Sequence, residues 1–322
     1  MRQAPLVVSF RPHSHSKADV TTMYLNTILA LMPAAAIGVS HYGLHALRVI
    51  LLSMGSAMVF EIILQRLFRR EITVHDGSAA FAGLLFALLL PPSTPFWVIL
   101  VGAFMSMLVG KHVFGGLGCN PINSVLVGWT VVFLSWPQYV NFDFSLLNYD
   151  PGFSTLYPLS VLKKEGAAGI GQFAIKDLLL GNQAGGIGAA SALCIVAGGT
   201  YLVLRGFASW IVPASFLIGI ALCSQLFHSV DPARYAGPLF HILAGNALLG
   251  AFFLAPDYAS SPGNPPGRFF YGLGAGVFAM LLRVWSSNID GVIFAIMIMN
   301  IAAPLLEMVL SKPRQFEKVQ QI

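Results

Sequence analysis

The chain has 322 residues, of which 56% are hydrophobic and only 10% are charged. Soluble domains carry about 25% charged residues, so this composition excludes a water-soluble enzyme. The formal net charge of +5 would suit nucleic-acid binding in a soluble chain, but the basic residues here lie mostly at the ends of apolar runs. That placement is typical of a membrane protein, and no nucleic-acid partner is expected. The three cysteines show no C-x-x-C spacing, so no metal site is predicted either.

Ten apolar runs approach the roughly 20 residues that a helix needs to cross a bilayer. They lie at 23–40, 47–65, 77–91, 95–113, 122–137, 187–205, 208–228, 237–256, 268–285 and 291–311. The third run is short and ends at Pro91-Pro92, so we expect a broken or partly re-entrant helix, which is tolerated where other helices satisfy its backbone. The sequence therefore predicts an all-α membrane protein with about ten transmembrane helices.

The lysines and arginines indicate the orientation, because cytoplasmic segments of membrane proteins carry more of them. With the N-terminus in the cytoplasm, 12 of the 18 fall on the cytoplasmic side and six on the outer side. The outer six are Arg48, Lys163, Lys164, Lys176, Arg234 and Arg283. We therefore expect a multi-pass protein of the inner (cytoplasmic) membrane with both termini in the cytoplasm.

One long polar-to-mixed stretch divides the spans into two sets of five. Residues 1–137 would form the N-terminal half, 138–186 an extracytoplasmic loop and 187–322 the C-terminal half. An odd number of spans in each half makes any repeat inverted, and the run from His75 to Pro91 resembles that from His241 to Pro256. Such interrupted segments at matching positions point to a site at the membrane midplane, although small residues also allow close helix packing. The expected fold is two inverted five-helix halves with short broken helices.

The segment from Gly110 to Asn123 interrupts the apolar region with a lysine, a histidine, several glycines and two asparagines. Glycine disfavours a helix by ~1 kcal/mol relative to alanine, so we expect the part from Gly115 to Asn123 to be a non-helical break buried among helices at the centre of the protein. The asparagine side chains there could satisfy freed backbone groups or coordinate a cation or cofactor. Our candidate midplane site consists of Asp76, Lys111, Asn120, Asn123, His241 and Asn246. No residue is assigned as catalytic.

Four titratable residues in the spans, His241 among them, allow two interpretations. Glu61 and Glu307 lie late in their spans beside basic residues, so we expect each to reach the cytoplasmic surface and form an ion pair there. An acid inside the bilayer would instead indicate function, because its charge is costly there. His112 and His241 could carry protons or serve as hydrogen-bonded structural groups.

The residues from Gly115 to Gly128 read G-G-L-G-C-N-P-I-N-S-V-L-V-G. This run resembles the G-G-L-G-x-N-P-F-N-P-A-L-x-G signature of the RnfD/NqrB family. The family comprises membrane subunits of the Rnf complex and of the sodium-pumping NADH:quinone oxidoreductase. Further matching runs follow in the family's order, at 76–79, 90–92, 240–245, 250–257 and 291–296. The length of the chain favours the RnfD branch.

This resemblance implies a membrane subunit of an electron-transport complex that couples electron transfer between ferredoxin and NAD to sodium or proton translocation. The chain would not be catalytic alone, because electrons must reach it from other membrane and peripheral subunits. The alternative is a solute channel or transporter with no redox role. Without the resemblance, the ten spans, the possible inverted repeat and the polar residues near interrupted helices would favour it. A flavin absorption spectrum would distinguish the two.

The resemblance also implies an FMN that is attached through its phosphate to a threonine in an outer loop. Alignment on Pro158-Leu159 places Tyr157 at the acceptor position, and the nearest hydroxyl of the right kind is Thr155. A phenol is a poor substitute for threonine in a phosphoester. We therefore expect FMN that is bound non-covalently or absent, the alternative being attachment to Thr155.

Overall fold

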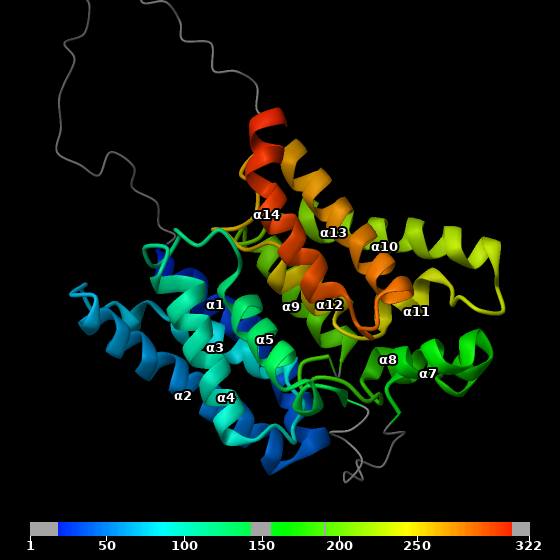
Figure 1. The fold of residues 1–322 in the computed structure, drawn as a ribbon, viewed down its shortest axis with the longest axis horizontal. Helices are drawn as coiled ribbons and strands as arrows, with labels where there is room; N and C mark the ends of the chain where they lie inside the picture. Colours follow the sequence, from blue (N-terminus) through cyan, green and yellow to red (C-terminus); the bar gives the residue numbers. More distant parts are fainter. Residues whose placement is uncertain (1–18, 143–155, 190, 311–322) are drawn as a thin grey trace, which may run out of the picture.

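The computed structural model describes residues 19–142, 156–189 and 191–310. Most of these residues are helical, and none of them forms a β-strand. Figure 1 shows helices α1–α5 on one side of the molecule and α9–α14 on the other. The two groups meet where α1 packs against α9. The predicted all-α class is confirmed.

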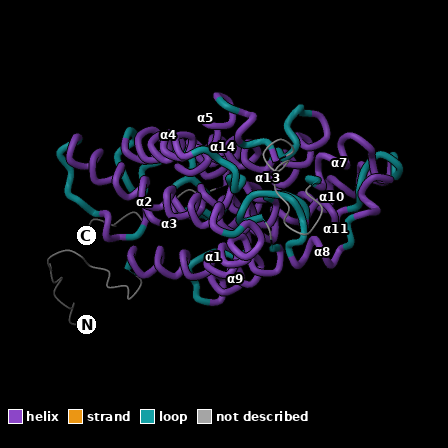
Figure 2. The backbone as a smooth tube through the Cα atoms, turned by 90° about the horizontal axis from the view of Figure 1, so that it is seen from below, coloured by secondary structure: helices purple, strands orange, loops and turns teal. Residues whose placement is uncertain are grey.

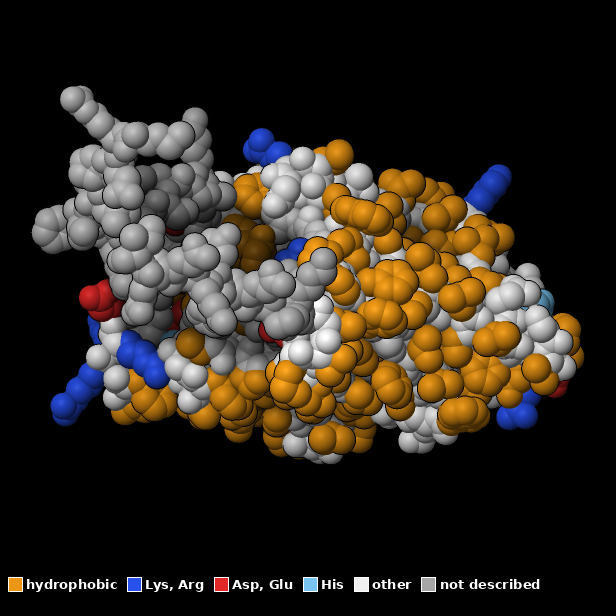
Figure 3. All heavy atoms as spheres, turned by 90° about the horizontal axis from the view of Figure 1, so that it is seen from above, with side chains coloured by type: hydrophobic (Ala, Val, Ile, Leu, Met, Phe, Trp, Pro, Cys, Tyr) orange, Lys and Arg blue, Asp and Glu red, His pale blue; other side chains and the backbone are white. Residues whose placement is uncertain are grey.

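Five helices in the described part of the chain are long and apolar enough to cross a membrane. They are α1 (Val20–Tyr42), α2 (Leu44–Leu67), α10 (Ile211–Val230), α13 (Pro265–Trp285) and α14 (Val292–Leu310). Large apolar side chains on these helices face outward, and hydrophobic side chains cover much of the visible described surface in Figure 3. A surface of this kind is suited to lipid rather than to water.

The other predicted runs form shorter or broken helices. α3 (Ser78–Leu89), α5 (Ser124–Ser135) and α9 (Ala192–Leu204) have 12, 12 and 13 residues, and α4 (Phe96–Met107) continues into a π-helical turn, Leu108–His112. The eighth run is interrupted at Gly245, which separates α11 (Pro238–Leu243) from α12 (Ala247–Leu249) and a π-helical turn, Gly250–Leu254. A helix of 12 residues is about 18 Å long, shorter than the hydrocarbon core of about 30 Å.

A short helix that ends inside a protein needs partners for its last carbonyl groups. At the end of α3, the carbonyls of Leu88 and Leu90 accept hydrogen bonds from the N–H groups of Gly188 and Ile187, at 2.8 and 3.1 Å. A Cβ atom on Gly188 would lie 2.6 Å from Leu88 Cβ, so this close approach requires glycine. The segment before α9 therefore completes the third helix of the first half.

The first half completes the broken helix of the second half in turn. The Asn123 side-chain amide donates to the carbonyl of Leu254, at the end of the second π-helical turn, at 3.1 Å. The Asn123 side-chain oxygen accepts a hydrogen bond from the N–H of Val125 at 3.0 Å and thereby caps α5. The Asn123 side chain thus forms hydrogen bonds with backbone groups at the ends of two helices.

Close packing of α10 against α13 depends on glycine. A Cβ atom on Gly276 would lie 2.2 Å from the Phe216 carbonyl oxygen, and one on Gly219 would lie 2.5 Å from that of Leu273. Small residues allow helix backbones to approach in this way in membrane proteins.

The stretch between the halves contains short helices where it is described. A 3₁₀ turn, Pro137–Tyr139, follows α5, and later come α7 (Pro158–Glu165), a 3₁₀ stretch, Gly166–Gln172, and α8 (Ile175–Leu180). In Figures 1 and 2, α7 and α8 lie beside α10 and α11 at one end of the molecule.

Candidate functional site

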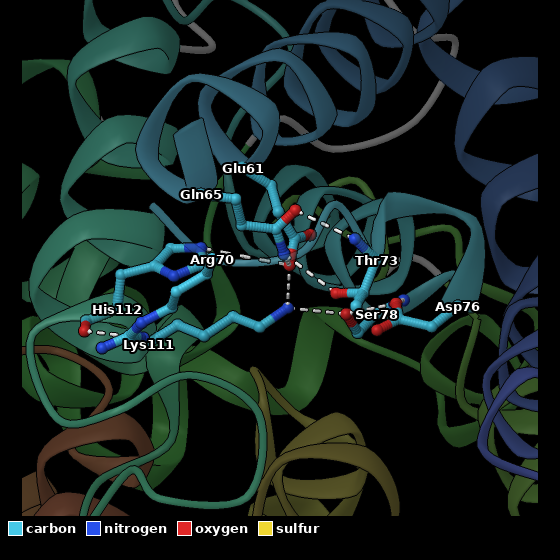
Figure 4. A network of polar contacts seen from close by, with 8 residues as sticks. All are labelled: Glu61, Gln65, Arg70, Thr73, Asp76, Ser78, Lys111 and His112. Atoms are coloured by element: carbon cyan, nitrogen blue, oxygen red, sulfur yellow. Dashed lines mark hydrogen bonds and ion pairs between the residues drawn. The ribbon is translucent and has the colours of Figure 1, made fainter. Parts of the chain in front are cut away.

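A buried ion pair joins α2 to the end of α4 (Figure 4). Glu61 Oε1 accepts a hydrogen bond from Lys111 Nζ at 2.5 Å. Glu61 is 0% exposed, so the expectation that it reaches the surface is wrong. It shares a face of α2 with Ala57 and Leu64, and α2 packs against α3 and α4. Helix packing, rather than the nearby arginines, therefore sets its surroundings.

Lys111 also binds the start of α3. Its Nζ donates to Ser78 Oγ at 2.6 Å, and the hydroxyl and N–H of Ser78 donate to Asp76 Oδ1 at 2.6 and 2.7 Å. Gly77, with φ +79°, makes the turn between Asp76 and Ser78, a conformation that favours glycine. Two predicted site residues, Asp76 and Lys111, are thus connected through Ser78.

Gln65 extends this network toward the chain that leads into α3. Its side-chain amide donates to Glu61 Oε1 at 3.2 Å and to Thr73 Oγ1 at 2.9 Å, and its oxygen accepts from the N–H of Thr73 at 3.0 Å. Arg70 donates to the carbonyl of His112 at 3.3 Å. These contacts hold α2, the start of α3 and the end of α4 together.

His112 joins this network through its carbonyl, and its ring lies at the limit of ion-pair distance from Glu61. Its ring stacks near Phe68, and its Nε2 is 4.0 Å from Glu61 Oε1. The side chain is 2% exposed, and neither ring nitrogen has a hydrogen-bond partner among the described residues. The expectation that the His112 ring is a hydrogen-bonded structural group is therefore not confirmed among the described residues. A proton on Nε2 would give it an ionic partner in Glu61.

Two cavities meet at Lys111. The larger, of about 720 Å³, is lined by polar groups from both halves of the chain, among them Ser78, Lys111, Asn120, Asn123, Arg205 and Asp257. The second, of about 540 Å³, is lined by Glu61, Asp76, Lys111 and His112. Lys111 and Leu117 line both cavities, so the two cavities adjoin at these residues.

The glycine-rich segment that follows His112 is non-helical, as predicted. Gly115, Gly116 and Gly118 have φ values of +128°, +104° and +82°. Asn120 and Asn123 are buried, but Leu117 is 41% exposed. The expectation that the whole segment is buried at the centre of the protein is therefore wrong, and its asparagines are the part that reaches inward.

Asn120 connects this segment to the loop after the second π-helical turn. Its side-chain amide donates to the carbonyl of Ile122 at 3.0 Å and interacts with the carboxylate of Asp257, which accepts a hydrogen bond from Ser260 Oγ at 2.8 Å. Partial removal from water raises the pKa of Asp257, and these hydrogen bonds to the ionised form oppose the shift. The larger cavity therefore has a carboxylate in its wall in addition to the ammonium of Lys111.

His241 and Asn246, the remaining predicted residues, belong to a second cluster at the break between α11 and α12. Arg283, near the end of α13, donates to the carbonyls of His241 and Ala244 at 2.6 and 3.1 Å and pairs with Asp290 Oδ1 at 3.0 Å. Asp290 Oδ2 accepts a hydrogen bond from the N–H of Asn246 at 2.7 Å. The six candidates therefore do not form one midplane site but divide between two clusters.

Sequence reasoning assigned Glu61 to the surface and missed Ser78 in the first cluster. It also missed Arg283 and Asp290 in the second cluster. Arg283 gave a usable signal, because a charge near the end of an apolar span needs a partner, and Asp290 follows seven residues later. Ser78 gave none, since a serine near a helix start most often serves only as a cap.

Thr155 lies outside the described residues. Tyr157, at the expected acceptor position, is 1% exposed and packs against Phe142, with ring centroids 5.0 Å apart. Its phenol is therefore not presented at the surface, where a flavin transferase would have to reach it.

An aromatic cavity of about 230 Å³ lies beside Tyr157. Its walls include Trp129, Phe133 and Asn246. The Trp129 and Phe133 rings are stacked at 4.9 Å, and the side-chain oxygen of Asn246 is buried with no hydrogen-bond partner among the described residues. Stacked rings beside an open acceptor suit a flat heteroaromatic group that carries an N–H.

Comparison with known proteins identifies the family of this chain. The model of the NQR2, RnfD, RnfE family matches residues 7–317. The D subunit of the Na(+)-translocating ferredoxin:NAD(+) oxidoreductase complex of Acetobacterium woodii is 35% identical over 309 residues, 95% of this chain and 94% of the relative. The D subunit of the proton-translocating ferredoxin:NAD(+) oxidoreductase complex of Clostridium ljungdahlii is 32% identical and covers 93% of each chain. The D subunit of the ion-translocating oxidoreductase complex of Alcanivorax borkumensis is 31% identical over 94% of each. The chain belongs to the NQR2, RnfD, RnfE family.

Proposed function

We propose that this chain is the D subunit of an Rnf-type complex that couples electron transfer between ferredoxin and NAD to ion translocation across the membrane. The observation that carries the proposal is the match to named D subunits over nearly the whole of both chains. The apolar, all-helical fold supports a membrane subunit of this kind. The other membrane and peripheral subunits of the complex are its partners, and the assembled complex catalyses the reaction.

The test is purification through a tag on this chain, followed by assay of the complex. We expect the partner subunits to co-purify, and membrane vesicles to lose ferredoxin-dependent NAD reduction when the chain is deleted and to regain it on complementation. A chain that purifies alone, shows no flavin spectrum and moves a solute in proteoliposomes would instead support a transporter.

The coupling ion is sodium or the proton. One relative is named as sodium-translocating and another as proton-translocating, at similar identities of 35% and 32%. Ion uptake into inverted vesicles during ferredoxin oxidation decides between them. Sodium coupling predicts that activity requires sodium and that uptake persists with a protonophore, whereas proton coupling predicts that a protonophore abolishes uptake.

We propose that the chain crosses the membrane about ten times, in two inverted halves of five helices on either side of residues 138–186. Support comes from matching features at the start of the short helix in each half. Gly77 before α3 and Gly245 before α12 have φ values of +79° and +71°. In each half a cation from the end of the fourth helix binds beside this glycine and pairs with an acid. Lys111 binds Ser78 at the start of α3 and pairs with Glu61. Arg283 binds the carbonyl of Ala244, directly before Gly245, and pairs with Asp290.

The same proposal places both termini in the cytoplasm, because 12 of the 18 lysines and arginines then lie on that side. Reporter fusions after residue 322 and within the 3₁₀ stretch Gly166–Gln172 test this. Cytoplasmic activity at the end and periplasmic activity in the stretch are expected. A periplasmic C-terminus would contradict both the count and the inverted halves.

We propose that this subunit holds FMN non-covalently, with the aromatic cavity beside Tyr157 as the place for its ring. Trp129 and Phe133 would stack on the ring, and the Asn246 side-chain oxygen would accept a hydrogen bond from it. When bound, FMN would supply the electron-carrying group that the chain's own side chains lack. Denaturing gel electrophoresis under ultraviolet light should show no fluorescent band, and native protein should release flavin on unfolding. A band that disappears in Thr155→Val would contradict this and establish attachment to Thr155.

A further inference from the structure

Basic side chains on the expected outer side of the protein are not scattered. Four of the six line one pocket of about 230 Å³: Lys163, Lys164, Arg234 and Arg283. No acidic residue is among the described residues that line it. Basic residues on the outer side run against the usual bias of membrane proteins, so their convergence needs a cause.

The charges in this pocket are held in place but not all neutralised. Lys163 Nζ donates to the carbonyls of Ser286 and Asn288, and Arg234 stacks over the Tyr235 ring at 5.4 Å. No described acid forms a salt bridge with either cation, whereas Arg283 has Asp290. Partial burial lowers the pKa of Lys163, as expected where no carboxylate offsets the loss of water.

A buried hydrogen-bonding group also lines the pocket. His241 is 3% exposed, and its Nδ1 has no hydrogen-bond partner among the described residues. A ring nitrogen can donate to an anionic oxygen when it carries the proton. Such an unsatisfied buried group is costly unless a ligand or water completes it.

Neighbouring side chains place the pocket at the depth of lipid headgroups. Trp285 directly follows the pocket residue Val284 at the end of α13 and is 73% exposed. Exposed tryptophan at a helix end marks the membrane interface. Leu226 and Val230, at the end of α10, are 70% and 83% exposed and would face lipid. An anion at this depth most directly comes from a phospholipid.

We propose that this pocket binds the phosphate of an anionic phospholipid headgroup, with Lys163 and Arg234 as its principal cations and His241 at its buried wall. Basic pockets between membrane helices bind acidic headgroups through the same interactions. The acyl chains would lie against the exposed apolar faces of α10 and α13. The site is separate from the Lys111 network and adjoins the aromatic cavity, with which it shares Ile289. The proposal does not depend on the redox function.

The test uses the full chain in nanodiscs of phosphatidylcholine, with or without phosphatidylglycerol, with bound lipid counted by native mass spectrometry. We expect selective retention of phosphatidylglycerol. Arg234→Gln should weaken it about fivefold, and Arg234→Gln with Lys163→Gln roughly 30-fold, since each cation near a membrane surface contributes on the order of a fivefold factor. Lys176→Gln is the matched control, because Lys176 is exposed on α8 and does not line the pocket.

Thermal unfolding in phosphatidylcholine alone establishes that the variants remain folded. Folded variants that retain phosphatidylglycerol as well as the native protein would overturn the proposal, as would an equal loss in Lys176→Gln. Inorganic phosphate added to phosphatidylcholine discs separates the two sources of the anion. If it raises the unfolding temperature as much as phosphatidylglycerol does, the site takes soluble phosphate and the lipid assignment is wrong.

Discussion

Replacing Lys111 by methionine tests whether the buried ion pair holds α2, α3 and α4 together. The change keeps an unbranched side chain but leaves Glu61, which is 0% exposed, without its cation. An unpaired buried carboxylate takes up a proton. Since the pKa of a free glutamic acid is about 4.3, protonation at pH 7 costs about 3.7 kcal/mol. This lies within the ~3–5 kcal/mol measured when one partner of a buried pair is removed.

The double variant Glu61→Gln/Lys111→Met should recover most of this lost free energy of unfolding, because it removes both charges of the pair and leaves neither without its partner. At pH 5 the same proton uptake costs less, so Lys111→Met alone should lower the free energy of unfolding by only about 1 kcal/mol. The assay is denaturant unfolding of the purified chain in detergent, arranged as a double-mutant cycle at both pH values, with exposed Lys176→Met as the control. If Lys111→Met lowers the free energy of unfolding by less than about 1 kcal/mol at pH 7, or by an amount that does not change with pH, the reasoning is refuted. Either result would mean that water reaches Glu61.

Three further variants address packing and helix ends. Gly276→Val should lower the thermal unfolding temperature and cost ~1–3 kcal/mol, because the added atoms overlap the backbone of α10. Gly55→Ala is the control, since its Cβ would meet nothing within 4 Å. Asn123→Leu loses two helix-end hydrogen bonds and should cost ~1–3 kcal/mol and reduce electron transfer by the complex, whereas Val131→Leu should change neither. Arg283→Met unpairs a carboxylate and two carbonyls at the α11–α12 break, and proteolysis there should become faster than in the native chain.

The helices could be predicted because their signal is local. Each of the ten apolar runs contains helix, since hydropathy and length alone determine where a chain can lose contact with water. The third helix is short, as Pro91-Pro92 indicated, because proline cannot continue the hydrogen-bond ladder. The break at Gly245 was harder to place, since one glycine within an apolar run is common.

The site was less predictable because it depends on which helix face meets which. Lys111 and Asp76 were selected for being charged within apolar surroundings, and they do lie in one network. Glu61 was assigned to the surface from the arginines that follow it in sequence, but the face of α2 that carries it packs against other helices. Only tertiary contacts determine that face. The grouping of His241 with Lys111 failed for the same reason, since matching positions in two halves of a chain need not meet in space.

The hydrogen bonds between the halves also bear on how the protein is made. The carbonyls that end α3 receive their donors from Gly188 and Ile187, about 100 residues later in synthesis, and the end of the broken helix takes its donor from Asn123. Until residue 188 has been synthesised, the last carbonyl groups of α3 lack these hydrogen-bond donors in the membrane. We expect water or an insertion factor to bind them during that time. Neither half can then mature alone. Co-expressed halves divided in the stretch between α5 and α9 should assemble only with each other, and a half expressed without its counterpart should be degraded.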